Sequence, residues 1–304
     1  MAVTAGSGLS LGLSADQKAL RELAHEFAEK EIRPLAAEYD ERSTHPAGVI
    51  AKAHELGLLN PHIPCEYGGA GLPALDGALV TEELCWGCAG IGTSLICNTL
   101  ICNTLGTAPV MLAGNDEQKR RRLAPLVEAP LLCSFALTEP DAGSDVSAIK
   151  TTAVRHGDEY VLNGSKMFIT NAGHAAWLVV FASTDRSKGQ RGLSAFVVRA
   201  DDEGVTVDRH LDKMGQRATD TSAVSFHDVV VPAGDRLGAE GEGFKIAMAT
   251  LDKTRPGTAA GAVGVARAAY EHAVEYAKER VQFGQPIAIN QGVNFLVSDM
   301  ATEI

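Results

Sequence analysis

The sequence of 304 residues lacks any long hydrophobic run. Its longest apolar run, from Ala175 to Ala182, is far shorter than the roughly 20 residues that a membrane-spanning helix needs. Basic residues are also scarce, since 27 Lys and Arg stand against 38 Asp and Glu and give a formal net charge of −11. These shortages predict a protein whose main partner is neither a membrane nor a nucleic acid.

Disulfide and metal-site spacings are missing as well. Six cysteines in a chain of this length do not make a disulfide scaffold. Cys85-Trp86-Gly87-Cys88 is a lone CxxC motif, which we interpret as thiols packed in a helix. The nine histidines show no HxxH or HExxH spacing, so the sequence predicts no metal site.

The N-terminal segment has no Lys or Arg in its first 14 residues. It therefore resembles neither a signal peptide nor an Arg-rich transit peptide, which favours the cytoplasm of a bacterium. The mitochondrial matrix is the alternative for a processed eukaryotic protein. The composition, 45% hydrophobic and 21% charged, is that of a soluble globular protein, and the length predicts two or three domains.

Helical periodicity dominates the first part of the chain. Ser14 and Gln17 form a capping box, so we expect a helix that begins there, runs to Tyr39 and is kinked at Pro34. Further helices are expected over Ala47–Leu56, Ala74–Trp86 and Asp116–Leu126. Residues 1–132 are therefore predicted to form an N-terminal α-helical domain.

From Cys133 the periodicity changes to short β-rich runs separated by turns such as His156-Gly157-Asp158. Closely spaced strands predict a small barrel or sandwich over residues 133–240. Helical periodicity returns at Phe244, and a last helix is expected from about Asn290. The expected fold class is α+β: an N-terminal helical domain, a middle β domain and an incomplete C-terminal helical domain at residues 241–304.

The stretch from Cys133 to Asn171 has the features of a binding site. The apolar run Ser134–Leu137 leads into Thr138-Glu139-Pro140 and the turn-forming segment Asp141–Asp145. Because Pro140 and Gly143 exclude a continuing strand or helix, we expect a loop at the end of a strand. Its N–H groups and hydroxyls are suited to a phosphate or to the polar edge of a ring.

Asn163-Gly164, between two β-rich runs, predicts a hairpin. Strand alternation then places Lys166, Phe168 and Thr170 on one face of its second arm, and Met167 and Ile169 on the other. An aromatic ring and a hydroxyl two residues apart could stack on a planar cofactor and bond its edge. The alternative, from the residues alone, is a surface hairpin beside a polar loop.

The amino-acid sequences of these two segments favour the interpretation as a binding site. Ala136–Val146, which reads ALTEPDAGSDV, closely resembles the flavin-loop signature of the acyl-CoA dehydrogenase family. Gly164–Asn171, GSKMFITN, resembles that family's flavin-stacking strand at the usual distance. Asp252–Pro256 and Arg280–Gly284 are similar to the medium- and short-chain branch, and the resemblance spans about residues 14 to 304.

The resemblance implies an oxidoreductase that binds FAD without a covalent bond and dehydrogenates an acyl-CoA thioester. A carboxylate takes the α-proton, the flavin accepts hydride from the β-carbon, and electron-transferring flavoprotein takes the electrons. A carboxylate in a dry site and hydrogen-bond donors on the thioester carbonyl are chemically suited to this step. The family also implies a homo-oligomer, a dimer or tetramer.

The resemblance assigns site residues by position. The residues assigned to the FAD are Phe135, Ala136, Leu137, Thr138, Gly143, Ser144, Phe168, Ile169 and Thr170. Those assigned to the FAD of a neighbouring subunit are Arg280, Gln282, Phe283, Asn290 and Gln291, and those assigned to the substrate are Ser144, Asp252 and Arg255. Many relatives have Trp where this chain has Phe168. Without the resemblance, Arg280 reads as a helix-end cation, and Asp252 as a helix charge paired with Arg255.

No catalytic base is found at either position that the family uses. In the medium- and short-chain branch the glutamate lies beyond the position of Ile304. In the isovaleryl and long-chain branch the base matches Thr254, and threonine cannot serve. We therefore expect a chain truncated at its C-terminus. The alternatives to an active dehydrogenase are a non-catalytic flavin- or acyl-CoA-binding protein, an inactive fragment, or an oxidase of the same superfamily.

A duplication stands out before the flavin loop. Ile96–Leu100 is repeated without change as Ile101–Leu105. Five extra residues at about 100° each would rotate the following helical residues by about 140°. Either the acyl-chain pocket that this helix borders in the family is reshaped, or the copy is an error that is tolerated or destabilising.

Overall fold

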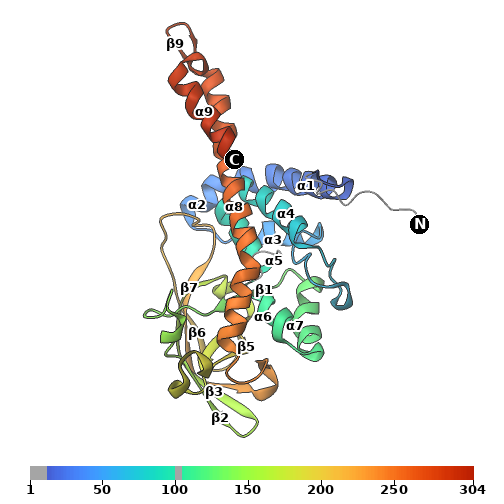
Figure 1. Ribbon diagram of the computed structural model, residues 1–304, viewed down its shortest axis with the longest axis vertical. Coiled ribbons are helices and arrows are strands. Elements are labelled where there is room, and N and C mark those ends of the chain that lie inside the picture. Colours follow the sequence, from blue (N-terminus) through green and yellow to red (C-terminus); the bar gives the residue numbers. More distant parts are fainter. Residues whose placement is uncertain (1–11, 100–104) are drawn as a thin grey trace, which may run out of the picture.

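The computed structural model describes residues 12–99 and 105–304. Helices come first, then a sheet, then helices again, as the sequence predicts (Figure 1). The N-terminal helices are α1 (Ala15–Phe27), α2 (Ala36–Arg42), α3 (Ala47–Glu55), α4 (Ala74–Gly87), α5 (Ala89–Thr99), α6 (Thr107–Ala113) and α7 (Asp116–Glu128).

The start of α1 and the break after it follow from the local sequence. Ser14 and Gln17 exchange side-chain and backbone hydrogen bonds, which completes the predicted capping box. After Phe27 the helix widens into a π-turn and then tightens into a 3₁₀-turn, Arg33–Leu35. Pro34 has no N–H to donate, and its ring clashes with the preceding turn, so the predicted kink is confirmed.

The longest element is α8 (Gly243–Glu279), whose 37 residues pack along α4. Two of its glycines lie against α4 and allow the two helices to approach closely. A Cβ on Gly264 would lie 2.0 Å from the Glu82 carbonyl oxygen, and one on Gly261 would lie 3.1 Å from the Cys85 sulfur. Figure 1 shows α8 along the long axis, carrying α9 (Gln291–Glu303) and the hairpin β9 (Val281–Gln282) and β10 (Gln285–Pro286) at its far end.

The middle of the chain forms one sheet in the order β6-β7-β3-β2-β4-β5-β8, with β1 parallel to β4. The strands are β1 (Leu132–Ala136), β2 (Thr152–His156), β3 (Glu159–Thr170), β4 (Ala175–Ser183), β5 (Leu193–Arg199), β6 (Val205–His210), β7 (Thr221–Pro232) and β8 (Arg236–Leu237). The longest apolar run of the sequence is thus the central strand, β4.

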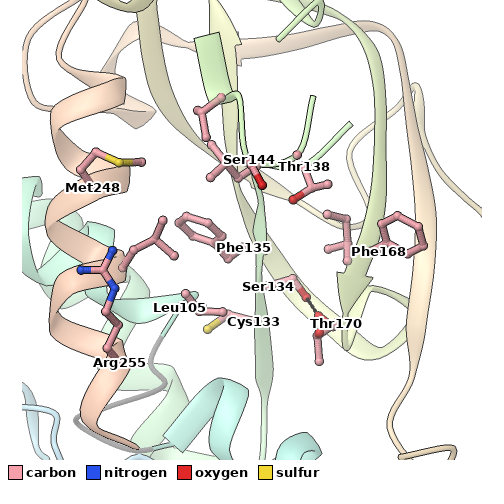
Figure 2. Close-up of a pocket in the computed structure, with 15 residues that line it drawn as sticks. Leu105, Cys133, Ser134, Phe135, Thr138, Ser144, Phe168, Thr170, Met248 and Arg255 are labelled. Atoms are coloured by element: carbon pink, nitrogen blue, oxygen red, sulfur yellow. Dashed lines mark hydrogen bonds between the residues drawn. The ribbon is translucent and has the colours of Figure 1, made fainter. Parts of the chain in front are cut away.

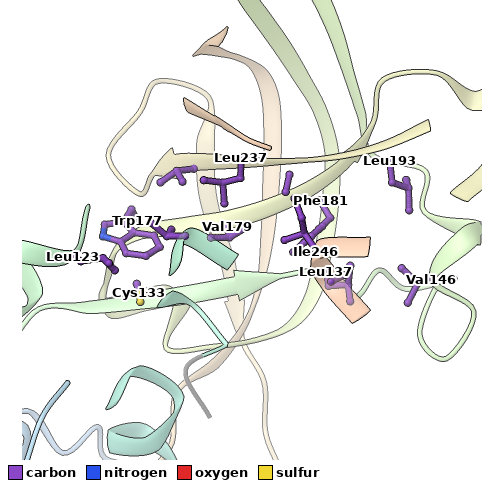
Figure 3. Close-up of a cluster of buried hydrophobic side chains, with 14 of the residues drawn as sticks. Leu123, Cys133, Leu137, Val146, Trp177, Val179, Phe181, Leu193, Leu237 and Ile246 are labelled. Carbon is purple, nitrogen blue, oxygen red and sulfur yellow. The ribbon is translucent and has the colours of Figure 1, made fainter. Parts of the chain in front are cut away.

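Both faces of β4 are buried, which explains its unbroken apolar sequence. Trp177, Val179 and Phe181 pack beneath α6, α7 and α8 in one core (Figure 3). The alternate side chains, such as Val180, lie in a second core with residues of β3, β5 and β7.

The sheet folds over this second core. Thr152 and Ser183 are the only described pair that joins β2 to β4. In a flat sheet, β3 and β5 would lie three strand spacings apart, about 14 Å. Instead, the rings of Tyr160 on β3 and Phe196 on β5 have centroids 4.9 Å apart. This closure is the sandwich-like packing expected for the middle domain.

The predicted hairpin at Asn163-Gly164 is wrong. β3 runs straight through these residues, and the turn lies before it, where Gly157 has φ +61°. Gly164 sits instead at a bulge against β7, with φ +150°, where a Cβ would lie 2.5 Å from the Thr151 hydroxyl. Glycine is required here by a bulge and a close approach, and not by a turn.

The expected effect of the duplication lies outside the described residues, because these omit residues 100–104. The first copy continues α5 as far as Thr99, and Leu105, the last residue of the second copy, precedes α6. Within the described ranges, no helix is both long and apolar enough to cross a bilayer.

Two histidine rings join the N-terminal helices to the sheet. His45, before α3, stacks on His174, before β4, with centroids 3.6 Å apart and planes 9° apart. Nδ1 of His45 is buried and has no hydrogen-bond partner among the described residues. Burial, assisted by His174 and opposed by Asp220, lowers the pKa of His45 to about 4.

This depressed pKa predicts an acid-sensitive junction. Above pH 6.5, His45 is neutral in the folded and in the unfolded chain, so its protonation does not lower the free energy of unfolding. Between about pH 6.5 and 4 only the unfolded chain takes up the proton, so the folded state loses stability, by about 1 kcal/mol at pH 5 after allowance for partial exposure.

His45→Phe keeps a stacked ring but removes the titration. Urea unfolding at pH 7 and pH 5 should show a smaller loss of unfolding free energy for this variant than for the parent. An equal loss in both proteins would rule out His45 as the source.

Candidate functional site

A cavity of about 420 Å³ lies where the three parts of the chain meet (Figure 2). One wall is β1 and the loop after it, a second is the end of β3, and a third is α8. Its size is that of a typical small-molecule site. The sequence-predicted residues that line it are Phe135, Leu137, Thr138, Gly143, Ser144, Phe168, Ile169, Thr170 and Arg255.

Two predicted residues lie elsewhere. The side chain of Ala136 points away from the cavity into the core between the sheet halves, because neighbouring residues of β1 face opposite sides. Asp252 is exposed and pairs with Arg255, and it does not line the cavity.

Sequence reasoning missed several lining residues. Met248 and Leu251 stand seven and four residues before Arg255, so all three share one face of α8 and helical spacing was the available signal. Ser134 had no such signal, since only the fold brings it to the site. The full set of missed residues is Leu105, Cys133, Ser134, Val146, Met248 and Leu251.

A second bulge in β3 shapes the cavity. Between Lys166 and Ile169 the pairing with β7 is interrupted, and the Met167 N–H donates to the Thr138 carbonyl oxygen at 2.9 Å instead. Phe168 then takes φ +62°, unusual for an aromatic residue, and its side chain is 64% exposed. Strain of this kind is held only where surrounding contacts fix it, and it concentrates at functional sites.

This bulge overturns the predicted alternation. Lys166 and Phe168 do not share a face, because Lys166 is fully buried while Phe168 projects at the cavity rim. A bulge shifts the side-chain period by one residue, so strict alternation fails after it. Thr170 is held by its carbonyl oxygen, which accepts a hydrogen bond of 2.7 Å from the Ser134 hydroxyl (Figure 2).

Lys166 forms a buried ion pair with Glu139 of the loop. Its Nζ donates to Glu139 Oε1 at 2.8 Å and to the Leu137 carbonyl oxygen at 3.0 Å. Burial lowers the pKa of Lys166 to about 8, although the carboxylate opposes that shift. For Glu139, burial alone would raise the pKa, but Lys166 and hydrogen bonds from Thr151 and Lys150 outweigh it and the pKa lies below its usual value. Each group therefore favours the ionised form of the other.

The remaining predicted residues lie at the far end of α8. Arg280 follows its last residue, and 25 residues separate it from Arg255. At 1.5 Å per residue this is about 37 Å, so Arg280 is remote from the cavity of its own chain. The same holds for the other members of the set predicted to reach a neighbouring subunit, which are Gln282, Phe283, Asn290 and Gln291.

Comparison with known families decides the identity. The chain matches the N-terminal domain of acyl-CoA dehydrogenase at residues 14–129, the middle domain at 134–229 and the C-terminal domain at 241–304. The chain belongs to the acyl-CoA dehydrogenase family. The members are FAD-dependent oxidoreductases, so the resemblance stated from the loop and strand is confirmed.

Individual relatives agree. The chain is 41% identical over 299 residues to a probable medium-chain specific acyl-CoA dehydrogenase 2, mitochondrial, of Caenorhabditis briggsae, a match that covers 97% of this chain and 72% of the relative. Butyryl-CoA dehydrogenase from Megasphaera elsdenii is similar in structure, with a TM-score of 0.92, 41% identity, and coverage of 97% of this chain and 77% of that one.

A further solved structure, described as an electron transferring flavoprotein of Acidaminococcus fermentans, contains a chain that matches with a TM-score of 0.93 and 43% identity. That match covers 97% of this chain and 77% of the other.

The cavity fits the flavin of this acyl-CoA dehydrogenase family member. Phe168 offers an exposed aromatic face for a planar ring system. The Thr138 N–H has no backbone acceptor among the described residues, so it is available to a carbonyl oxygen or nitrogen of the ring edge. Phe135 and Leu137 supply apolar walls, and these donors and walls match a flat ring with a polar edge.

Two substitutions test this placement. Thr138→Val removes the hydroxyl and should weaken FAD binding about fivefold, as expected for a lost hydrogen bond of roughly 1 kcal/mol. Phe168→Ala removes the stacking face and should weaken FAD binding at least as much. FAD affinity is measured by titrating the apoprotein and following flavin fluorescence.

Thr206→Val and Val230→Ala are the matched controls, because both residues are exposed on strands away from the cavity. If Thr138→Val and Phe168→Ala bind FAD as tightly as these controls do, the ring does not lie in this cavity.

Proposed function

We propose that this chain catalyses the FAD-dependent α,β-dehydrogenation of an acyl-CoA thioester to the 2-enoyl-CoA. The observation that carries the proposal is the cavity, in which an aromatic rim and two threonines face an apolar stripe of α8. A flavin held between the loop after β1 and the end of β3 and an acyl chain lying along α8 would meet within one cavity. FAD, when bound, accepts the hydride from the substrate β-carbon.

The lining residues have distinct parts in this proposal. Met248 and Leu251 form an apolar wall for the acyl chain. Arg255, at the edge of the same wall, is a cation for the phosphates of the CoA arm. For Ser144, exposed on the loop, we propose contacts to the FAD pyrophosphate and the CoA arm, as the family resemblance implies.

Removal of the α-proton requires a base. The described residues that line the cavity include no carboxylate. Thr254, on α8, is 4% exposed and its hydroxyl donates to the Leu251 carbonyl oxygen, so it has no basic group to offer. We therefore propose that a carboxylate from outside this set of lining residues completes the site.

The electron acceptor and the length of the substrate's acyl chain are further parts of the proposal. The similar structure described as an electron transferring flavoprotein supports electron-transferring flavoprotein as the acceptor. Similarity to butyryl-CoA dehydrogenase and to a medium-chain specific relative favours short and medium acyl chains over long ones. The compartment stays the prediction from the sequence, bacterial cytoplasm or mitochondrial matrix, and cell fractionation tests it.

We propose that the chain forms a homo-oligomer and that the far end of α8 contributes to the subunit interface. Phe283 is completely exposed, with φ +51°, and Phe295 and Leu296 on α9 are also exposed. Apolar side chains gathered on a projecting arm are typical of an interface. Sedimentation velocity should show dimers or tetramers, whereas a monomer at every concentration would contradict the proposal.

The test of the proposed activity is an anaerobic titration of the FAD-loaded chain with butyryl-CoA and octanoyl-CoA. Loss of the visible flavin absorbance, with formation of the 2-enoyl-CoA, is the expected result. Retention of a fully oxidised spectrum with tightly bound acyl-CoA would instead support the alternative, a non-catalytic flavin- and acyl-CoA-binding protein.

A further inference from the structure

The buried pair Lys166–Glu139 lies directly behind the cavity wall. Lys166 is completely buried, and Glu139 is 5% exposed. Leu137 and Thr138, the residues just before Glu139, line the cavity on the other side. The pair is thus separated from a bound ring by a single stretch of backbone.

Hydrogen bonds from neighbouring groups offset the cost of burying this ion pair. Besides Lys166, the Glu139 carboxylate accepts hydrogen bonds from the Lys150 N–H at 2.6 Å, the Thr151 N–H at 3.0 Å and the Thr151 hydroxyl at 2.5 Å. These donors come from the segment that enters β2, whereas Lys166 belongs to β3. Glu139 therefore fastens the loop to two strands.

The contact of Lys166 with Leu137 sets the direction of one peptide group. Nζ holds the Leu137 carbonyl oxygen at 3.0 Å on the buried side. The described chain contains no cis peptide bond, so the Thr138 N–H points opposite to that oxygen. It therefore points toward the cavity, and no backbone group among the described residues accepts it.

We propose that Lys166 is a positioning residue of the FAD site, which holds and polarises the Leu137–Thr138 peptide so that its N–H faces the polar edge of the flavin. This inference rests on the proposed function. A cation on the carbonyl oxygen draws electron density along the peptide and makes the N–H a stronger donor. Because reduction adds negative charge to the ring edge, this donor should favour the reduced flavin over the oxidised one.

The alternative is that the pair only holds the fold together. Removal of Lys166 alone would strand a buried carboxylate, which is destabilising whatever the role. The informative variant is therefore the double variant Lys166→Met/Glu139→Gln, which removes both charges, keeps the length of the Glu139 side chain and shortens that of Lys166 by one atom. Lys150→Met is the matched control, because Lys150 pairs with Asp141 of the same loop at 2.7 Å but both side chains are 69% exposed.

Three quantities are measured for the parent, the two single variants, the double variant and the control: urea unfolding of the FAD-free chain, the Kd for FAD, and the reduction potential of the bound flavin. The double variant should recover most of the unfolding stability lost by Lys166→Met. Its Kd for FAD should stay at least tenfold higher than that of the parent. Relative to oxidised flavin, the double variant should bind reduced flavin at least tenfold less tightly than the parent does. The reduction potential of the bound flavin should therefore fall by about 30 mV for two electrons.

The control should match the parent in all three quantities. A double variant with the FAD affinity and the potential of the parent would overturn the positioning role while leaving the proposed function intact. A parent chain that binds no FAD would overturn the proposed function, and this inference with it.

Discussion

The site depends on one constraint, the fixed distance between the loop after β1 and the bulged end of β3. Two contacts set it: the Met167 N–H on the Thr138 carbonyl oxygen, and the buried Lys166 ammonium on Leu137 and Glu139. A chain that left Lys166 without these acceptors would bury an unpaired charge at a cost of several kcal/mol. The polar network therefore selects one loop conformation, and the strained backbone and exposed ring of Phe168 are its consequence.

The third wall has a different origin. α8 is held against α4 by close contacts at Gly261 and Gly264, where larger residues would collide with Cys85 and Glu82. This packing fixes the rotation of α8, and so Met248, Leu251 and Arg255 face the cavity together. The same helix leads into the hairpin of β9 and β10, whose turn carries the exposed Phe283. The packing of α8 against α4 thus determines the positions of the cavity wall on α8 and of the exposed segment that follows α8.

The sequence predicted the architecture well because it rests on local signals. The capping box at Ser14, the break at Pro34 and the change of periodicity at Cys133 all act within a few residues. The failures are long-range. Asn163-Gly164 has the sequence of a turn, yet pairing with β7 keeps β3 straight. Lys166 would normally be an exposed strand residue, and only Glu139, 27 positions earlier, allows its burial. The family motif located the loop, but not the buried pair behind it.

The most direct test of this account is a crystal structure of the chain grown with FAD. The account predicts the isoalloxazine ring in the cavity between the loop and α8, in contact with Phe168 and with its polar edge hydrogen-bonded to the Thr138 N–H. A ring bound elsewhere, or bound in the cavity with the Thr138 N–H directed away from it, would contradict the account.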